Sequence, residues 1–149
     1  GMYGAIIVSD APRDTTRDHL IVAGGGGLPM FYKEGPAFLL VNGRREPKPI
    51  HMTVGDTNRV RIVSIHADEV LHFRFGTEAQ AARWNPLARD GADLPAALRA
   101  AEPAVVTMGP GETADFTYVP TRPGSMMLEV WIDRGQRVVL PVEVQARTK

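Results

Sequence analysis

The chain has 149 residues, a length typical of one domain and sufficient to bury a core without disulfide bonds. Acidic and basic residues balance at 17 each, so charge gives no reason to expect nucleic acid or an anionic membrane as a partner. The absence of cysteine excludes disulfides, thiolate nucleophiles and cysteine-ligated metal centres. No apolar run approaches the length that spans a bilayer, and no signal peptide precedes the first strand-like segment.

Short segments with alternating or β-branched apolar residues predict an all-β fold of many strands. Glycine and proline are frequent and scattered, as is typical of sandwiches with short connections. In chain order the predicted strands are Tyr3–Ser9, Arg17–Val22, Phe38–Val41, Pro49–Val54, Asn58–Ile65, Val70–Phe75, Trp84–Ala88, Ala104–Met108, Thr113–Val119, Ser125–Ile132 and Arg137–Gln145.

The connections between these strands carry their own signals. Ala23–Pro36, with its run of four glycines, predicts a flexible loop, and Asn42-Gly43 predicts a tight turn. Pro95–Ala101 is rich in alanine and leucine and predicts the one short helix. No internal repeat or domain boundary interrupts the sequence, so residues 1–149 are expected to form a single domain.

Period-two alternation assigns side chains to the two faces of each strand. The predicted inward rows are Leu71, Phe73 and Phe75; Met126, Leu128, Val130 and Ile132; Ala114, Phe116 and Tyr118; and Val138, Leu140, Val142 and Val144. His72 and Arg74 then point outward, as do Met127, Glu129 and Trp131. Two facing sheets with these inner rows form a sandwich core.

Candidate chemistry outside this pattern is sparse. The glycine run lacks the Lys-Ser/Thr ending of a P-loop, and no serine lies in a Gly-x-Ser-x-Gly elbow. His66 and His72 lie on either side of a predicted turn that could bring them together, but no histidine pair has zincin spacing. The favoured interpretation is that both histidines are surface or interface residues.

Several segments of the sequence carry motifs in a distinctive order and spacing. They are GMYGAIIV at Gly1–Val8; Phe38–Gly43, followed by Gly55-Asp56 and Arg59–Ile62; Trp84–Pro95; and Gly111–Phe116, followed by Arg122–Gly124. Together they resemble the multicopper oxidase family. The first is similar to the end of a copper-bearing cupredoxin domain, so residues 1–9 resemble the tail of a preceding domain. The others are similar to the cupredoxin domain that follows. The resemblance implies a cupredoxin-like Greek-key β-sandwich.

The copper ligands of the family are missing from this sequence. The His-rich family motif corresponds to Glu69–Gly76, in which only His72 is retained. The family's His-Cys-His positions correspond to Glu129, Val130 and Trp131. Type 1 copper needs a thiolate and two imidazoles, so no such centre is expected. His72, Arg74, Glu129, Val130 and Trp131 are therefore interpreted as degenerate ligand positions that form an interface or a small polar pocket.

These observations predict a copper-free domain similar to the second domain of a multicopper oxidase, without catalytic residues or a cofactor of its own. It would pack beside a copper-bearing cupredoxin domain, in the same chain or in another subunit, or form a homo-oligomer. Copper and oxidase activity would belong to the parent protein, with a periplasmic or secreted location if that parent resembles the family. The alternatives are a stand-alone binding module and a weak copper-binding protein that uses His66, His72 and Met2.

One pairing follows from the face assignment. Arg74 and Glu129 lie at outward positions of two strands that neighbour each other in the family's topology. One hypothesis is that they pair through charge-assisted hydrogen bonds. The alternative, two solvated surface charges, is the interpretation that the sequence favours.

Overall fold

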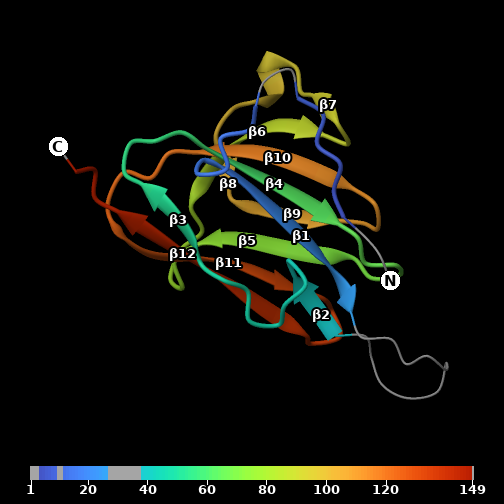
Figure 1. The fold of residues 1–149 in the computed structure, drawn as a ribbon. Coiled ribbons are helices and arrows are strands. Elements are labelled where there is room, and N and C mark those ends of the chain that lie inside the picture. The colour runs from blue at the N-terminus through green and yellow to red at the C-terminus, as the bar shows by residue number, and fades with distance from the viewer. Residues whose placement is uncertain (1–3, 10–11, 27–37, 149) are drawn as a thin grey trace.

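The computed structural model describes residues 4–9, 12–26 and 38–148, which form two packed β-sheets (Figure 1). Among these residues no helix is long and apolar enough to cross a membrane. The elements are β1 (Asp18–Gly26), β2 (Phe38–Val41), β3 (Ile50–Thr53), β4 (Asn58–Ser64), β5 (Leu71–Gly76), β6 (Arg83–Arg89), β7 (Ala92–Asp93), η1 (Ala96–Leu98), β8 (Glu102–Pro103), β9 (Val105–Met108), β10 (Thr113–Tyr118), β11 (Gly124–Trp131) and β12 (Arg137–Gln145).

The first sheet, called sheet A, has the strand order β2-β1-β4-β10-β6-β7, with β8 paired to β6. The second, sheet B, has the order β3-β12-β11-β5-β9. Both are mixed, because β1 runs parallel to β4 and β12 runs parallel to β3 while the other pairs are antiparallel. The chain passes repeatedly between the sheets, as the predicted cupredoxin-like sandwich requires.

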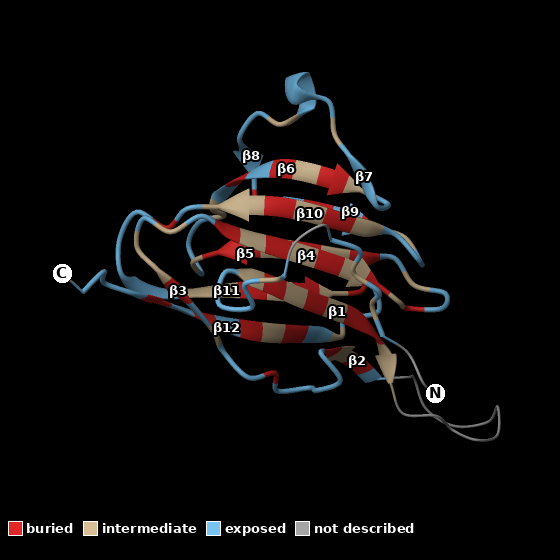
Figure 2. Ribbon diagram, turned by 45° about the horizontal axis from the view of Figure 1, so that its top comes forward, coloured by how far each residue is buried: buried red, intermediate tan, exposed pale blue. Residues whose placement is uncertain are grey.

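The core lies between the sheets, and the predicted inward rows are buried, except that Tyr118 and Met126 are partly buried (Figure 2). Leu71, Phe73 and Phe75 are at most 1% exposed, and Trp84 stacks on Phe116 with ring centroids 3.8 Å apart. Burying each large side chain contributes about 1.5–3 kcal/mol of transfer free energy. The alternation of buried and partly exposed residues along β5 and β11 fixes which side chains face outward.

The turn at Asn42-Gly43 is confirmed, because both residues have positive φ (49° and 73°). They connect Val41, the last residue of β2, to Arg44, which pairs with Val41 in an antiparallel bridge. The predicted helix over Pro95–Ala101 is reduced to the exposed 3₁₀ turn of Ala96–Leu98. Favourable helix propensity was not enough here, because the segment buries no apolar side chain against the core.

Two further predictions are wrong in the described residues. Ala23–Gly26, assigned to a loop, continues β1 and pairs with Phe38–Val41. A Cβ built on Gly24 would lie 2.5 Å from Ile65 Cγ1, so glycine here permits a close approach of two segments. Residues 4–9, assigned to a strand, are not one, and Ile6 and Val8 are 94% and 91% exposed. The loop prediction for residues 27–36 lies outside the described residues.

Candidate functional site: the outer face of sheet B

The outward positions of β5 and β11 form one continuous surface. In the antiparallel register Arg74 lies opposite Glu129, and His72 lies opposite Trp131. The next strand, β12, places Arg137 opposite Trp131 on the other side of β11. Opposed side chains on one face of a sheet are close enough to interact, so these five residues form a group, called the outer cluster.

Glu129 is the centre of the outer cluster. Its Oε2 accepts a hydrogen bond of 3.1 Å from Arg74 Nη1, and its Oε1 accepts one from Arg137 Nη2. The side chains of Arg74 and Glu129 are only 21% and 13% exposed. Arg74 Nη2 also donates to the carbonyl oxygens of Thr77 and Glu78, at 2.9 and 3.1 Å. Arg74 thus pairs with Glu129, so the favoured interpretation of two solvated charges is wrong and the pairing hypothesis is confirmed. Arg74 also fixes the turn that follows β5.

His72 is held on three sides. Its ring stacks on Trp131 with centroids 5.3 Å apart and planes 22° apart. Nε2 lies 3.1 Å from Asp133 Oδ1, and Nδ1 lies 3.0 Å from Thr107 Oγ1. Because a carboxylate only accepts hydrogen bonds, the neutral ring donates from Nε2 and accepts the Thr107 hydroxyl proton at Nδ1. Both nitrogens are therefore engaged.

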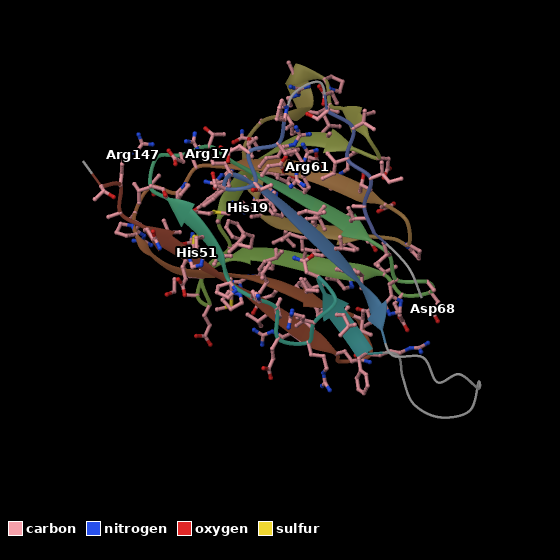
Figure 3. All side chains as sticks on the ribbon, in the orientation of Figure 1. Arg17, His19, His51, Arg61, Asp68 and Arg147 are labelled. Atoms are coloured by element: carbon pink, nitrogen blue, oxygen red, sulfur yellow. The ribbon has the colours of Figure 1, made fainter. Side chains whose placement is uncertain are left out.

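The other histidines lie apart from the outer cluster. His66 is 5% exposed, so its interpretation as a surface residue is wrong; its Nδ1 accepts the Glu69 N–H at 3.1 Å. Figure 3 places Asp68, which lies 3.2 Å from His66, at the opposite end of the molecule from His51 and His19. In residues 4–9, 12–26 and 38–148, no three His, Asp or Glu side chains are grouped to hold a metal ion. Met2 lies outside the described residues.

The outer cluster does not fit copper. The chain has no thiol, and Val130, which lies between Glu129 and Trp131 in β11, is a fully buried hydrocarbon. The Glu129 carboxylate is shared by two guanidinium groups, and the His72 nitrogens already bond Thr107 and Asp133. Copper would have to displace these partners and would still find no thiolate.

Three members of this surface were missed in the sequence: Arg137, Thr107 and Asp133. The outward parity of Arg137 could have been inferred from its neighbours Val138 and Leu140, which were assigned inward. Its contact with Glu129, however, depends on the β11–β12 register. Asp133 follows β11 in a turn, where period-two alternation no longer applies.

The outer face of sheet A carries a second ionic network that sequence reasoning also missed. Arg61 on β4 binds both oxygens of Asp18, at 2.7 and 3.0 Å, and Asp115 Oδ2 at 2.9 Å. Arg59 and Arg13 bond the same two carboxylates. Residues 5–9 line a cavity of about 450 Å³ beside Arg59, Arg61 and Asp115.

Charge pairing shifts the pKa values in this sheet A network. Burial alone would raise the pKa of Asp18, but the hydrogen bonds and charges of Arg61 and Arg13 outweigh it and hold that pKa below its ordinary value. The hydrogen bond to Asp18 raises the pKa of Arg61, aided by the nearby charge of Asp115. Both groups are therefore charged throughout the neutral range.

Comparison with solved structures identifies the fold. A laccase-like multicopper oxidase, CueO, from Ochrobactrum sp. superposes with a TM-score of 0.69 and 19% identity, over 93% of this chain and 33% of that one. The fold is that of a multicopper oxidase domain. Fet3p, a multicopper oxidase that functions in iron import, gives a TM-score of 0.70 at 13% identity, over 97% of this chain and 31% of its own.

The blue copper oxidase from Nitrosomonas europaea matches with a TM-score of 0.66 and 18% identity, over 91% of this chain and 47% of that one. The chain thus spans about a third to a half of the length of these oxidases. No protein-family model and no curated protein matches the sequence. The cupredoxin-like sandwich is shared with multicopper oxidases, while the cluster on its outer face is described from this chain's own residues.

Proposed function

We propose that this chain is a copper-free cupredoxin-like domain that packs, through the outer face of sheet B, against a copper-bearing cupredoxin domain. Oxidation would take place in that partner, and this domain would supply a rigid wall beside it. The observation that supports the proposal is the outer cluster. Its charged and aromatic side chains are half-buried and contact one another through hydrogen bonds and ring stacking. The resemblance to multicopper oxidases implies that these positions correspond to copper ligands in that family.

The surroundings of the outer cluster favour contact with another protein. Trp131 and Met127 are partly exposed on the same face, and Val105 on the edge strand β9 is 46% exposed. Tryptophan, methionine and arginine are enriched at protein interfaces. Covering the exposed apolar surface of Trp131, Met127 and Val105 with a partner removes it from water, which favours association. Asp133 and Glu143 at the margin supply a polar rim.

A copper titration tests the copper-free part of the proposal. Purified protein mixed with Cu(II) should remain without the intense visible absorption of a copper–thiolate bond, because it has no thiolate. A blue product would contradict the proposal. Colourless, stoichiometric binding that disappears in His72→Ala would support the histidine-only alternative instead.

Sedimentation tests the interface. The isolated chain should self-associate at high concentration, because the uncovered face of sheet B contacts a second copy when its natural partner is absent. Combining Trp131→Ala with Met127→Ser should reduce that association. Leu98→Ser is the matched control, since Leu98 is 60% exposed on η1, away from sheet B. A monomer at all concentrations, or equal effects of both changes, would contradict the proposal.

A further inference from the structure

A cavity of about 310 Å³ opens at one end of the sandwich, where β10 ends and β11 begins. The C-terminal part of β12 lies at the same end (Figure 1), since Gly124 pairs with Val144. The floor of the cavity is formed by Ala82, Tyr118 on β10 and Met126 on β11, which pack against the core. Its rim includes the polar side chains of Thr121, Arg122 and Ser125. The cavity therefore combines a mostly polar lining with the three side chains that pack against the core.

Arg122 is the single formal charge among the residues that line this cavity. In the described part of the chain it makes no ion pair, whereas Arg59 and Arg61, which line the cavity beside sheet A, are already bound to Asp115 and Asp18. Arg122 lies near enough to Tyr118 for its charge to oppose the rise that burial causes in the pKa of that hydroxyl. An unpaired guanidinium is well suited to bind a carboxylate through two parallel hydrogen bonds.

Tyr118 supplies a second donor and an aromatic surface. Its hydroxyl donates to Met126 Sδ at 3.4 Å, and a thioether is a weak acceptor that a carboxylate oxygen would readily replace. Its ring meets Phe75 edge-on, with centroids 4.9 Å apart, which fixes its position at the core. Burial raises the pKa of Tyr118, although Arg122 partly opposes this, so the hydroxyl keeps its proton at neutral pH.

We propose that this cavity binds a small aromatic carboxylate, with the carboxylate held by Arg122 and the ring placed on Tyr118 and Met126. A ring suits this floor because aromatic pairs and sulfur–aromatic contacts are favourable there. The cavity lies at the lower end of the size range of ligand sites, which limits the ligand to about one ring with short substituents. The inference does not depend on the copper-free interface function, since the outer cluster is not part of this cavity.

Titration of the ¹⁵N-labelled protein with benzoate, followed by NMR, tests the proposal. Saturable shifts are expected at the amides of Thr121, Arg122 and Met126. Benzamide, which has the same shape without the charge, should bind at least about tenfold more weakly, as the loss of a charged hydrogen bond requires. Acetate, which lacks the ring, should also bind more weakly. Linear shifts, shifts scattered over the surface, or equal binding of benzoate and benzamide would overturn the proposal.

Variants locate the site. Arg122→Gln should weaken benzoate binding about tenfold or more, and Tyr118→Phe, which keeps the ring, should weaken it by a smaller factor. Arg44→Gln is the matched control, because Arg44 is another exposed arginine without an ion pair among the described residues and does not line the cavity. An unchanged melting temperature will show that Arg122→Gln is folded. Equal benzoate binding by the Arg122 and Arg44 variants would end the idea.

Discussion

The outer faces of the two sheets carry arginine–carboxylate networks of opposite design. On sheet A a cation, Arg61, lies between Asp18 and Asp115. On sheet B an anion, Glu129, lies between Arg74 and Arg137. Both use alternate outward positions of neighbouring strands, and in both the central residue's side chain is 13% exposed.

The surroundings of the two networks differ. Residues 5–9 of the chain itself lie beside the sheet A network, whereas the sheet B network is bordered by the partly exposed Trp131 and Met127. The same side-chain chemistry therefore serves two purposes. We expect the network beside residues 5–9 to contribute to the stability of the fold, while the network bordered by partly exposed apolar side chains is the one proposed to meet a partner.

The largest expected effect is that of Arg61→Ala. It leaves Asp18 and Asp115 with one arginine each, Arg13 and Arg59, and we expect a loss of about 2 kcal/mol in the free energy of unfolding, measured by urea denaturation. Arg147→Ala is the control, because its ion pair with Asp56 involves a side chain that is 61% exposed and should be worth at most about 0.5 kcal/mol. If both variants lost a similar amount of free energy of unfolding, the stabilising role assigned to the sheet A network would be contradicted.

A double-mutant cycle on Arg74 and Glu129 should give a smaller coupling energy of about 1 kcal/mol, because the pair is half-buried and Glu129 retains Arg137. Each single change should destabilise the protein, and the double change should cost less than their sum. The exposed pair Arg134 and Glu69, in which Arg134 is 75% exposed, should show coupling near zero. Additive effects at Arg74 and Glu129 would make the outer cluster a set of independent surface charges.

A matched pair of changes tests whether residues 4–9 cover sheet A. Ile7 is partly buried beside the sheet A network, and Ile7→Ala should cost about 1 kcal/mol, less than the range for a fully buried isoleucine. Ile6 is 94% exposed, so Ile6→Ala should leave the free energy of unfolding unchanged. If thermal melts show equal effects, the contrast between a covered and an uncovered face fails.

The smallest effect concerns pH. The folded pKa of Asp18 lies below its unfolded value, so its contribution to stability is complete above about pH 4 and is lost as the pH falls through the folded pKa. Asp18→Asn should therefore flatten the fall in stability that denaturant curves show on acidification below about pH 4. An unchanged acid slope would mean that Asp18 is not held in its charged form by Arg61 and Arg13.

Much of the fold follows from period-two alternation, because each strand has one face on the core. Arg137–Gln145 was predicted to the residue, and the outward placement of His72, Arg74 and Glu129 came from the same rule. The rule failed where local sequence and tertiary contacts disagree. Gly24 has low strand propensity, but it lies in a strand because β2 and Ile65 approach it closely.

The side-chain contacts within the outer cluster were less predictable from the sequence than the outward placement of its residues. The contact of Glu129 with Arg137 and that of His72 with Asp133 depend on strand register and on a turn, which a single sequence does not encode locally. The burial of His66 likewise comes from the fold around it, since its neighbours Asp68 and Glu69 make the segment look like a solvated loop.

The parallel pairing of β12 with β3 has a consequence for how the protein is made. During synthesis β3 emerges early, but its partner is the last of the described strands to leave the ribosome. Contacts between segments so distant in sequence form slowly, so β3 and one edge of β11 would stay unpaired in the nascent chain until β12 is made. Ribosome-bound chains stopped before Arg137 should therefore depend most strongly on chaperones.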